Sequence, residues 1–174
     1  MPELSKNLLE EMNVQIQEEM FSAYLYYAIG AWFDSINLPG FAHWMRVQAL
    51  EEVTHAHKFH NHIIGRRGAV EFLEIKKPPK KWESPLDACE AAFKHEQHIT
   101  GRIHGLVDLA TKEGDHEATY GILNWFIEEQ IEEELNTDTL VQKLKMLGQD
   151  KNALYLLDKE VATRIFTPPI WLTY

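Results

Sequence analysis

The stretch that decides the fold is Gln48-Ala49-Leu50-Glu51-Glu52-Val53-Thr54-His55. In a helix, Glu52 and His55 are three residues apart and point the same way. The helical row that contains them also carries Met45 and Phe59, so a carboxylate and an imidazole fall on the face that should meet the core. Burying an unpaired carboxylate is costly, so the pair either lies on the surface or is neutralised by a partner. Because Glu-x-x-His recurs by chance, the motif alone does not choose between these interpretations.

The composition sets the class of protein. The chain has 174 residues, of which 45% are hydrophobic and 25% charged, so we expect a single globular domain over 1–174. A net charge of −10 without a basic stripe argues against a nucleic-acid partner. One cysteine, Cys89, excludes an internal disulfide framework. Because the amino terminus lacks an apolar signal segment and no run approaches membrane-span length, we expect a cytoplasmic protein without a membrane partner.

Helical periodicity in the apolar residues predicts four long helices and a short fifth. The predicted helices cover about 5–34, 40–65, 85–112, 116–147 and 152–164, and a tail follows at 167–174. Ser5 and Ser84 are the expected amino-terminal caps of the first and third helices, and Gly148 is expected to close the fourth.

The helical pattern is lost between Arg66 and Pro85. A helix of about 26 residues is ~39 Å long. About 18 extended residues can span roughly 60 Å, so this connector can return along the whole bundle. The third helix would then run parallel to the second. We therefore predict an all-α four-helix bundle with one long crossover between helices two and three.

Each long helix interrupts its apolar row with a carboxylate, an amide or an imidazole. These residues are Glu19 on the first helix, Glu52 and His55 on the second, Glu96 on the third, and Gln130 and Glu133 on the fourth. Their heights agree if the first and fourth helices run opposite to the other two. Clustered carboxylates either hold protons through raised pKa values or share cations. One imidazole among several carboxylates favours iron or manganese over structural zinc, and two metal ions bridged by Glu52 fit the carboxylate count.

The segments that carry these residues resemble bacterial-type non-haem ferritins. The matching segments are 21–26, 48–55, 94–97 and 125–134, and the resemblance extends over about 5–164. It implies the ferritin-like bundle and a homo-oligomeric hollow cage of 24 subunits. It also implies that the protein oxidises Fe(II) with dioxygen or hydrogen peroxide and stores ferric mineral inside the cage.

The resemblance assigns ligand roles residue by residue. Glu19, Glu52 and His55 would hold the first iron ion. Glu52 would bridge to a second iron ion, held by Glu96 with Gln130 nearby. Further matches are Tyr26, beside the centre, and the acids of a third iron site, Glu51, Glu129, Glu132 and Glu133. Without the resemblance, Tyr26 is equally well a core aromatic, and most of the third-site acids are a solvated acidic face.

The fourth helix separates ferritins from related di-iron proteins. Proteins that retain two metal ions carry a second Glu-x-x-His there, whereas this chain has Gln130-x-x-Glu133. A weaker second position would let the ferric product leave, as storage requires. The alternative function is a di-iron peroxidase or oxygenase with a retained metal cofactor; a silent shell subunit would lack the in-row ligands. We expect no haem, because the haem-binding methionine of bacterioferritins falls at Val53.

Three features lie outside this interpretation. Glu113-x-x-His116 repeats the motif beside a Gly-Asp turn, and we assign it no role. His57 and His60 can share a helix face, which leaves open a secondary part in iron or proton traffic. The tail after Thr167 departs from the family pattern and leaves the properties of any channel near the fifth helix open.

Overall fold

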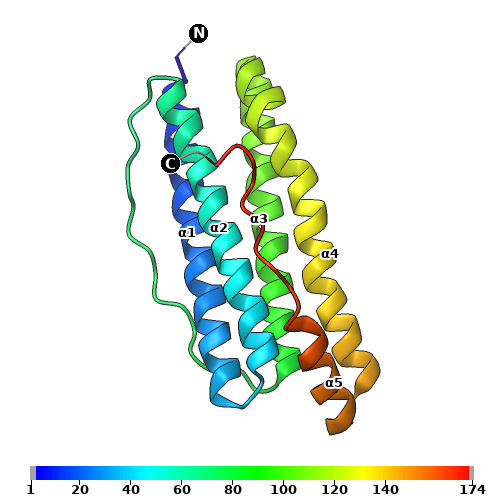
Figure 1. Cartoon of the computed structure of the whole chain (residues 1–174). Helices are drawn as coiled ribbons and strands as arrows, with labels where there is room; N and C mark the ends of the chain where they lie inside the picture. The colour runs from blue at the N-terminus through cyan, green and yellow to red at the C-terminus, as the bar shows by residue number, and fades with distance from the viewer. Residues whose placement is uncertain (1–2, 173–174) are drawn as a thin grey trace.

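The computed structural model describes residues 3–172, which form one bundle of helices (Figure 1). The elements are α1 (Lys6–Ser35), α2 (Pro39–Gly65), α3 (Pro85–Glu113), the π-helical segment η1 (Glu117–Leu123), α4 (Asn124–Leu147) and α5 (Lys151–Val161). Over this described range there is no strand, and none of the helices combines the length and apolar character needed to cross a bilayer. The predicted all-α fold with four long helices and a short fifth is confirmed.

The connector after α2 returns along the outside of α1 and α2 to the end of the bundle where α2 began (Figure 1). The side chain of Asn13 on α1 anchors it: Nδ2 donates to the Ala69 carbonyl at 3.1 Å, and Oδ1 accepts from the Glu71 amide at 2.9 Å. As a result α3 runs parallel to α2, while α1 and α4 run opposite to both, which confirms the predicted crossover (Figure 1).

The expected helix ends are present. Ser5 Oγ accepts the Leu8 amide at 3.0 Å, and Ser84 Oγ accepts the Asp87 amide at 3.1 Å, so each serine satisfies a backbone donor that the first helical turn leaves free. Gly148 ends α4 at a φ of 57°, a value that glycine adopts without a Cβ clash.

The amino terminus of α2 is capped from a distant part of the chain. Its own N-cap residue, Leu38, provides no side-chain hydrogen bond. Instead, buried Asp158 on α5 accepts through Oδ1 from the amides of Gly40 at 2.8 Å and Phe41 at 3.0 Å. A carboxylate at a helix amino terminus also meets the positive end of the helix dipole. This contact docks α5 on the bundle.

Replacing Gly40 by alanine should destabilise this contact. The added Cβ would lie 1.7 Å from the Asp158 carbonyl oxygen, so backbone must move. We expect a loss of about 1–3 kcal/mol in the free energy of unfolding, measured from guanidinium unfolding midpoints. Gly105→Ala is the matched control, because a Cβ at Gly105 meets nothing within 4 Å and should be neutral or mildly stabilising. Equal midpoints for the two variants would contradict the close packing of α5 on α2.

The core is divided into two apolar clusters with a polar layer between them. On α1, Ile16 belongs to one cluster and Ala23 to the other, and Glu19 lies between them. The same division holds on the other long helices. On those helices, the residues that lie between the two apolar clusters are Glu52, His55, Glu96, Gln130 and Glu133, all of them buried. The fold therefore brings one titratable layer from four helices to the middle of the bundle.

Candidate metal centre

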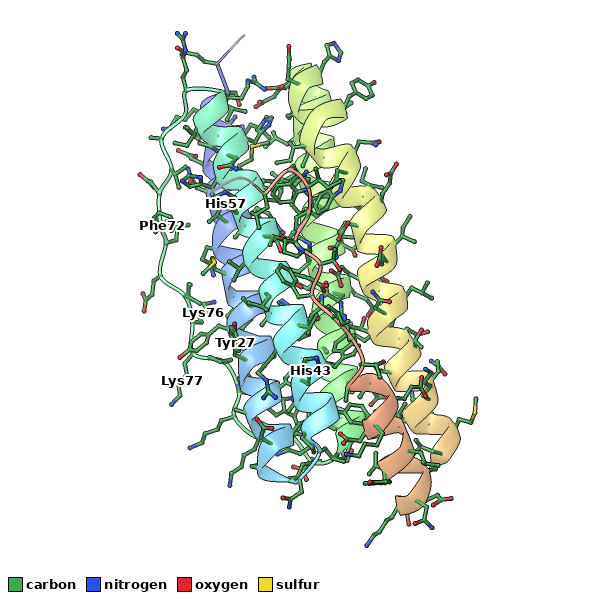
Figure 2. The ribbon with its side chains drawn as sticks, in the orientation of Figure 1. Tyr27, His43, His57, Phe72, Lys76 and Lys77 are labelled. Carbon is green, nitrogen blue, oxygen red and sulfur yellow. The ribbon has the colours of Figure 1, made fainter. Side chains whose placement is uncertain are left out.

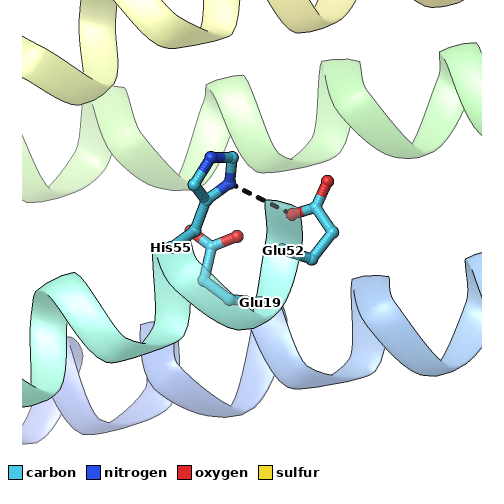
Figure 3. A group of neighbouring side chains, drawn as sticks. All are labelled: Glu19, Glu52 and His55. Atoms are coloured by element: carbon cyan, nitrogen blue, oxygen red, sulfur yellow. Dashed lines mark hydrogen bonds and ion pairs between the residues drawn. The ribbon is translucent and has the colours of Figure 1, made fainter. Parts of the chain in front are cut away.

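A group of three ligand-bearing side chains forms the centre of this layer. Glu19 from α1 and Glu52 and His55 from α2 place one ligand atom each within 4.8 Å of the others, and all three side chains are buried (Figure 3). His55 Nδ1 lies 3.3 Å from Glu52 Oε2. The spacing of three residues on α2 thus brings imidazole and carboxylate together, as the sequence indicated.

Two glutamines orient the carboxylates of this group. Gln15 Nε2 donates to Glu19 Oε1 at 2.9 Å, and Gln48 Nε2 donates to Glu52 Oε1 at 3.0 Å. Each glutamine precedes its glutamate by four residues, a repeat whose meaning sequence reasoning missed. The other oxygen of Glu19 is buried and has no hydrogen-bond partner among residues 3–172. An unpaired buried carboxylate oxygen beside two further ligands fits a cation.

His55 also belongs to a second group of possible ligands, with Glu129 and Glu133 from α4. Its Nε2 lies 3.5 Å from Glu129 Oε1, while its Nδ1 faces Glu52. One imidazole therefore lies between two sets of carboxylates.

Glu96 lies in the same layer but in neither of these groups. It accepts a hydrogen bond from the Tyr26 hydroxyl. Gln130 Nε2 lies 3.4 Å from Glu96 Oε2 and 3.3 Å from Thr100 Oγ1. The structure thus brings Glu96, Tyr26 and Gln130 together, as expected for a second position, while the ligand role of Glu96 stays a prediction.

The remaining predicted acids line a pocket of about 540 Å³ that opens between α2 and α4. Glu51 and Glu129 are half-buried, Glu132 is exposed, and Glu133 is buried. The pocket also contacts His55, so it adjoins the second ligand group. The four acids that the family resemblance assigns to a third iron site therefore share one cavity.

Burial shifts the pKa values of these acids upwards. Desolvation and the neighbouring Glu52 charge raise the pKa of Glu96 to about 8 and hold the pKa values of Glu19 and Glu133 well above the ordinary value. Desolvation likewise raises the pKa of Glu51 to about 7. Without a cation, the layer keeps protons at neutral pH.

Glu52 and His55 behave differently because they pair with each other. Burial raises the pKa of the Glu52 carboxyl, but the hydrogen bond and charge of His55 outweigh it and leave the pKa below the ordinary value. Burial lowers the pKa of His55, but hydrogen bonds to Glu129 and Glu52 outweigh that effect and raise it well above the ordinary value. A bound cation would take the place of these protons. One nitrogen and many oxygens suit iron or manganese.

The second Glu-x-x-His and the extra histidines of α2 belong to neither ligand group found among the described residues. Glu113 is exposed and accepts hydrogen bonds from Ser5 and Asn7, and it belongs to neither ligand group of the described chain. The rings of His57 and His60 stack at 5.7 Å, which confirms that they share a helix face. Figure 2 labels His57 on α2, where it lines a cavity together with His60 and Phe72 of the crossover rather than the acidic pocket.

Comparison with known proteins gives consistent matches. A family model described as "Ferritin-like domain" matches residues 9–147. The bacterial non-heme ferritin of Staphylococcus aureus (strain MRSA252) is 40% identical over 163 residues, which cover 94% of this chain and 98% of the relative. An open pore ferritin from Archaeoglobus fulgidus is 45% identical with a TM-score of 0.91 over 93% of this chain and 99% of its own. A closed form of that ferritin, engineered by mutagenesis, has 45% identity and a TM-score of 0.92 over 94% of this chain and 99% of its own.

Proposed function

Because the chain belongs to the ferritin family, we propose that it oxidises Fe(II) at the buried layer and stores the ferric product as mineral inside a hollow shell. The observation that supports this most directly is the buried group of Glu19, Glu52 and His55, in which one Glu19 oxygen lacks a protein partner in the described chain. Burying this group of charged side chains costs folding free energy unless a bound cation compensates their charge.

In this proposal Fe(II) is the substrate. Glu19, Glu52 and His55 bind the first ion, and Glu52 bridges towards a second ion at Glu96, near the Gln130 amide. Two Fe(II) ions release two electrons. Dioxygen takes up the two electrons with two protons to form hydrogen peroxide, or hydrogen peroxide takes them up with two protons to form two water molecules. The phenol of Tyr26, which can be oxidised, donates a hydrogen bond to Glu96 and so lies beside the second position.

The residue types at the ligand positions of α4, Gln130 and Glu133, support iron storage rather than a permanently retained metal cofactor. At the second position α4 contributes the neutral Gln130 amide, which holds a ferric ion less tightly than a carboxylate would. Glu129 and Glu133 provide the next ligands beside His55, and the acids of the α2–α4 pocket follow. Product can thus move out through the third site towards the mineral.

Exposed apolar side chains support assembly with further copies, for which we propose the 24-subunit shell. Tyr24 and Tyr27 on α1 are 51% and 43% exposed, and Phe72 on the crossover is 79% exposed. Figure 2 shows Phe72 on the crossover, beside α1 and α2. A cytoplasmic location stays a prediction.

Electron microscopy after aerobic Fe(II) loading tests the proposed function. We expect hollow shells that fill with electron-dense cores as iron is added. Small discrete particles without cores would contradict both assembly and storage. Two tightly held irons per chain after purification, with no core on loading, would favour the retained-metal peroxidase or oxygenase instead.

A further inference from the structure

The carboxyl-terminal tail, residues 162–172, leaves α5 and returns across the α2–α4 side of the bundle (Figure 1). At its start, His43 Nε2 on α2 lies 2.8 Å from the Arg164 carbonyl oxygen. Near its end, the rings of Trp171 and Trp125 pack edge-on at 5.9 Å, and Lys58 Nζ lies about 4 Å from the centre of each ring. The tail is therefore fixed at two points beside the acidic pocket.

The side chain of Arg164 enters that pocket. Its guanidinium pairs with Glu51 and donates through Nη1 to Gln48 Oε1 at 2.7 Å. Its Cζ lies 4.2 Å from the centre of the Trp44 ring, so the cation also stacks on an aromatic face. Among the lining residues of the described chain, Arg164 is the one lysine or arginine.

Arg164 and a metal ion in the pocket compete for the same carboxylate, that of Glu51. The guanidinium already neutralises Glu51, one of the four acids of the pocket. A cation in the pocket either displaces Arg164 and binds Glu51, or binds the other acids without the Glu51 carboxylate. Removing the guanidinium should therefore strengthen binding of a metal ion at the remaining acids.

Arg164 also reaches the buried layer through Gln48. Because the Gln48 carbonyl oxygen accepts from Arg164, its amide NH₂ faces the carboxylates of Glu52 at 3.0 Å and Glu133 at 2.6 Å. Loss of Arg164 would free this amide to rotate. The tail thus influences the bridging carboxylate without touching it.

We propose that Arg164 is a positioning residue that acts as a built-in cation of the third site, where it competes with metal at Glu51 and holds the Gln48 amide against Glu52 and Glu133. This inference rests on the proposed function only in that the pocket acids bind a metal ion. It does not require oxidation or mineral formation. The tail then sets how strongly the pocket retains an ion that has left the buried layer.

Terbium(III) alone, titrated into the metal-free assembled protein, tests the proposal, because Trp44 and Trp125 line the pocket and can sensitise terbium emission. We expect Arg164→Gln to bind terbium in the pocket roughly 5- to 100-fold more tightly than the unmodified chain. Arg164→Lys keeps a positive charge and should stay near the unmodified affinity. Arg46→Gln is the matched control, since Arg46 lies on α2 in an exposed 2.7 Å pair with Asp34.

A second substitution identifies the site that emits. Adding Glu132→Gln to Arg164→Gln should remove the gained emission, because Glu132 lines the pocket and belongs to neither ligand group found among the described residues. Unchanged or weaker terbium binding in Arg164→Gln would overturn the proposal, and so would a gain that survives Glu132→Gln. Structural damage predicts weaker binding rather than a gain. A chain that shows the gain but forms no iron core would refute the storage function alone.

Discussion

Replacing Glu52 by alanine is expected to slow Fe(II) oxidation by about 100-fold or more, while the assembled shell keeps its size. Loss of a residue that only hydrogen-bonds to a metal ligand lowers metal affinity or activity roughly 10- to 100-fold. Glu52 is the proposed bridging ligand itself, so its loss should have a larger effect. His55→Ala should have a similar effect, because His55 contributes to both ligand groups. Stopped-flow absorbance after mixing with aerobic Fe(II) measures the rate, and size-exclusion chromatography measures assembly.

The chain offers a matched control in its second Glu-x-x-His. Glu113→Ala and His116→Ala change the same residue types at the same spacing, but these exposed residues flank the turn between α3 and η1. Both should oxidise Fe(II) at the unmodified rate. Rapid oxidation that persists in Glu52→Ala and His55→Ala would refute the site assignment.

The metal-free protein should lose stability as the pH rises from about 5 to above 8. The pKa of Glu96 is about 8 in the folded state against an ordinary 4.5, so the folded state binds the proton more tightly. Its contribution is complete below 4.5 and is lost as the pH rises through about 8. His55, whose folded pKa is also raised, acts in the same direction above its ordinary value of 6.5. Glu52 has a lowered pKa, so its contribution is present above 4.5 and is lost as the pH falls.

We expect the change to be on the order of 2 kcal/mol, since each pKa unit corresponds to ~1.4 kcal/mol and the coupled layer shares its protons. Guanidinium unfolding midpoints at several pH values measure it. Glu96→Gln should flatten the pH dependence and stabilise the metal-free protein at high pH. Glu90→Gln, an exposed change on the same helix, is the control. Added Mn(II) should reverse the trend, because it replaces the protons; a metal-free midpoint that rises steadily with pH would contradict this account.

The sequence was sufficient for the parts of the structure that depend on local pattern. Serine caps and apolar periodicity are properties of neighbouring residues, so the helices and the crossover followed from them. The polar layer followed because a carboxylate such as Glu19 stands out in an otherwise apolar row. Side-chain direction in a helix then brought these residues to one level.

Tertiary contacts explain what was not predicted. We expected the fourth helix to begin near 116, but residues Glu117–Leu123 form the π-helical segment η1. There Asp115 caps the Ala118 amide and forms a two-point ion pair with Arg66 from the end of α2. We also expected the fifth helix to reach about 164, but α5 ends at Val161. Arg164 instead binds residues of α2 that are more than a hundred positions away, which periodicity cannot show.

The path of the tail affects where this protein can be modified. Because Trp171 packs on Trp125, and Trp125 lines the acidic pocket, the last residues that the structure describes lie close to that pocket. A purification tag or display peptide that follows them can reach the pocket acids. Histidines in such a tag would compete for the ions under study. The amino-terminal end of α1 lies at the end of the bundle opposite α5 (Figure 1). Fusion at that end leaves the α2–α4 side as the natural chain has it.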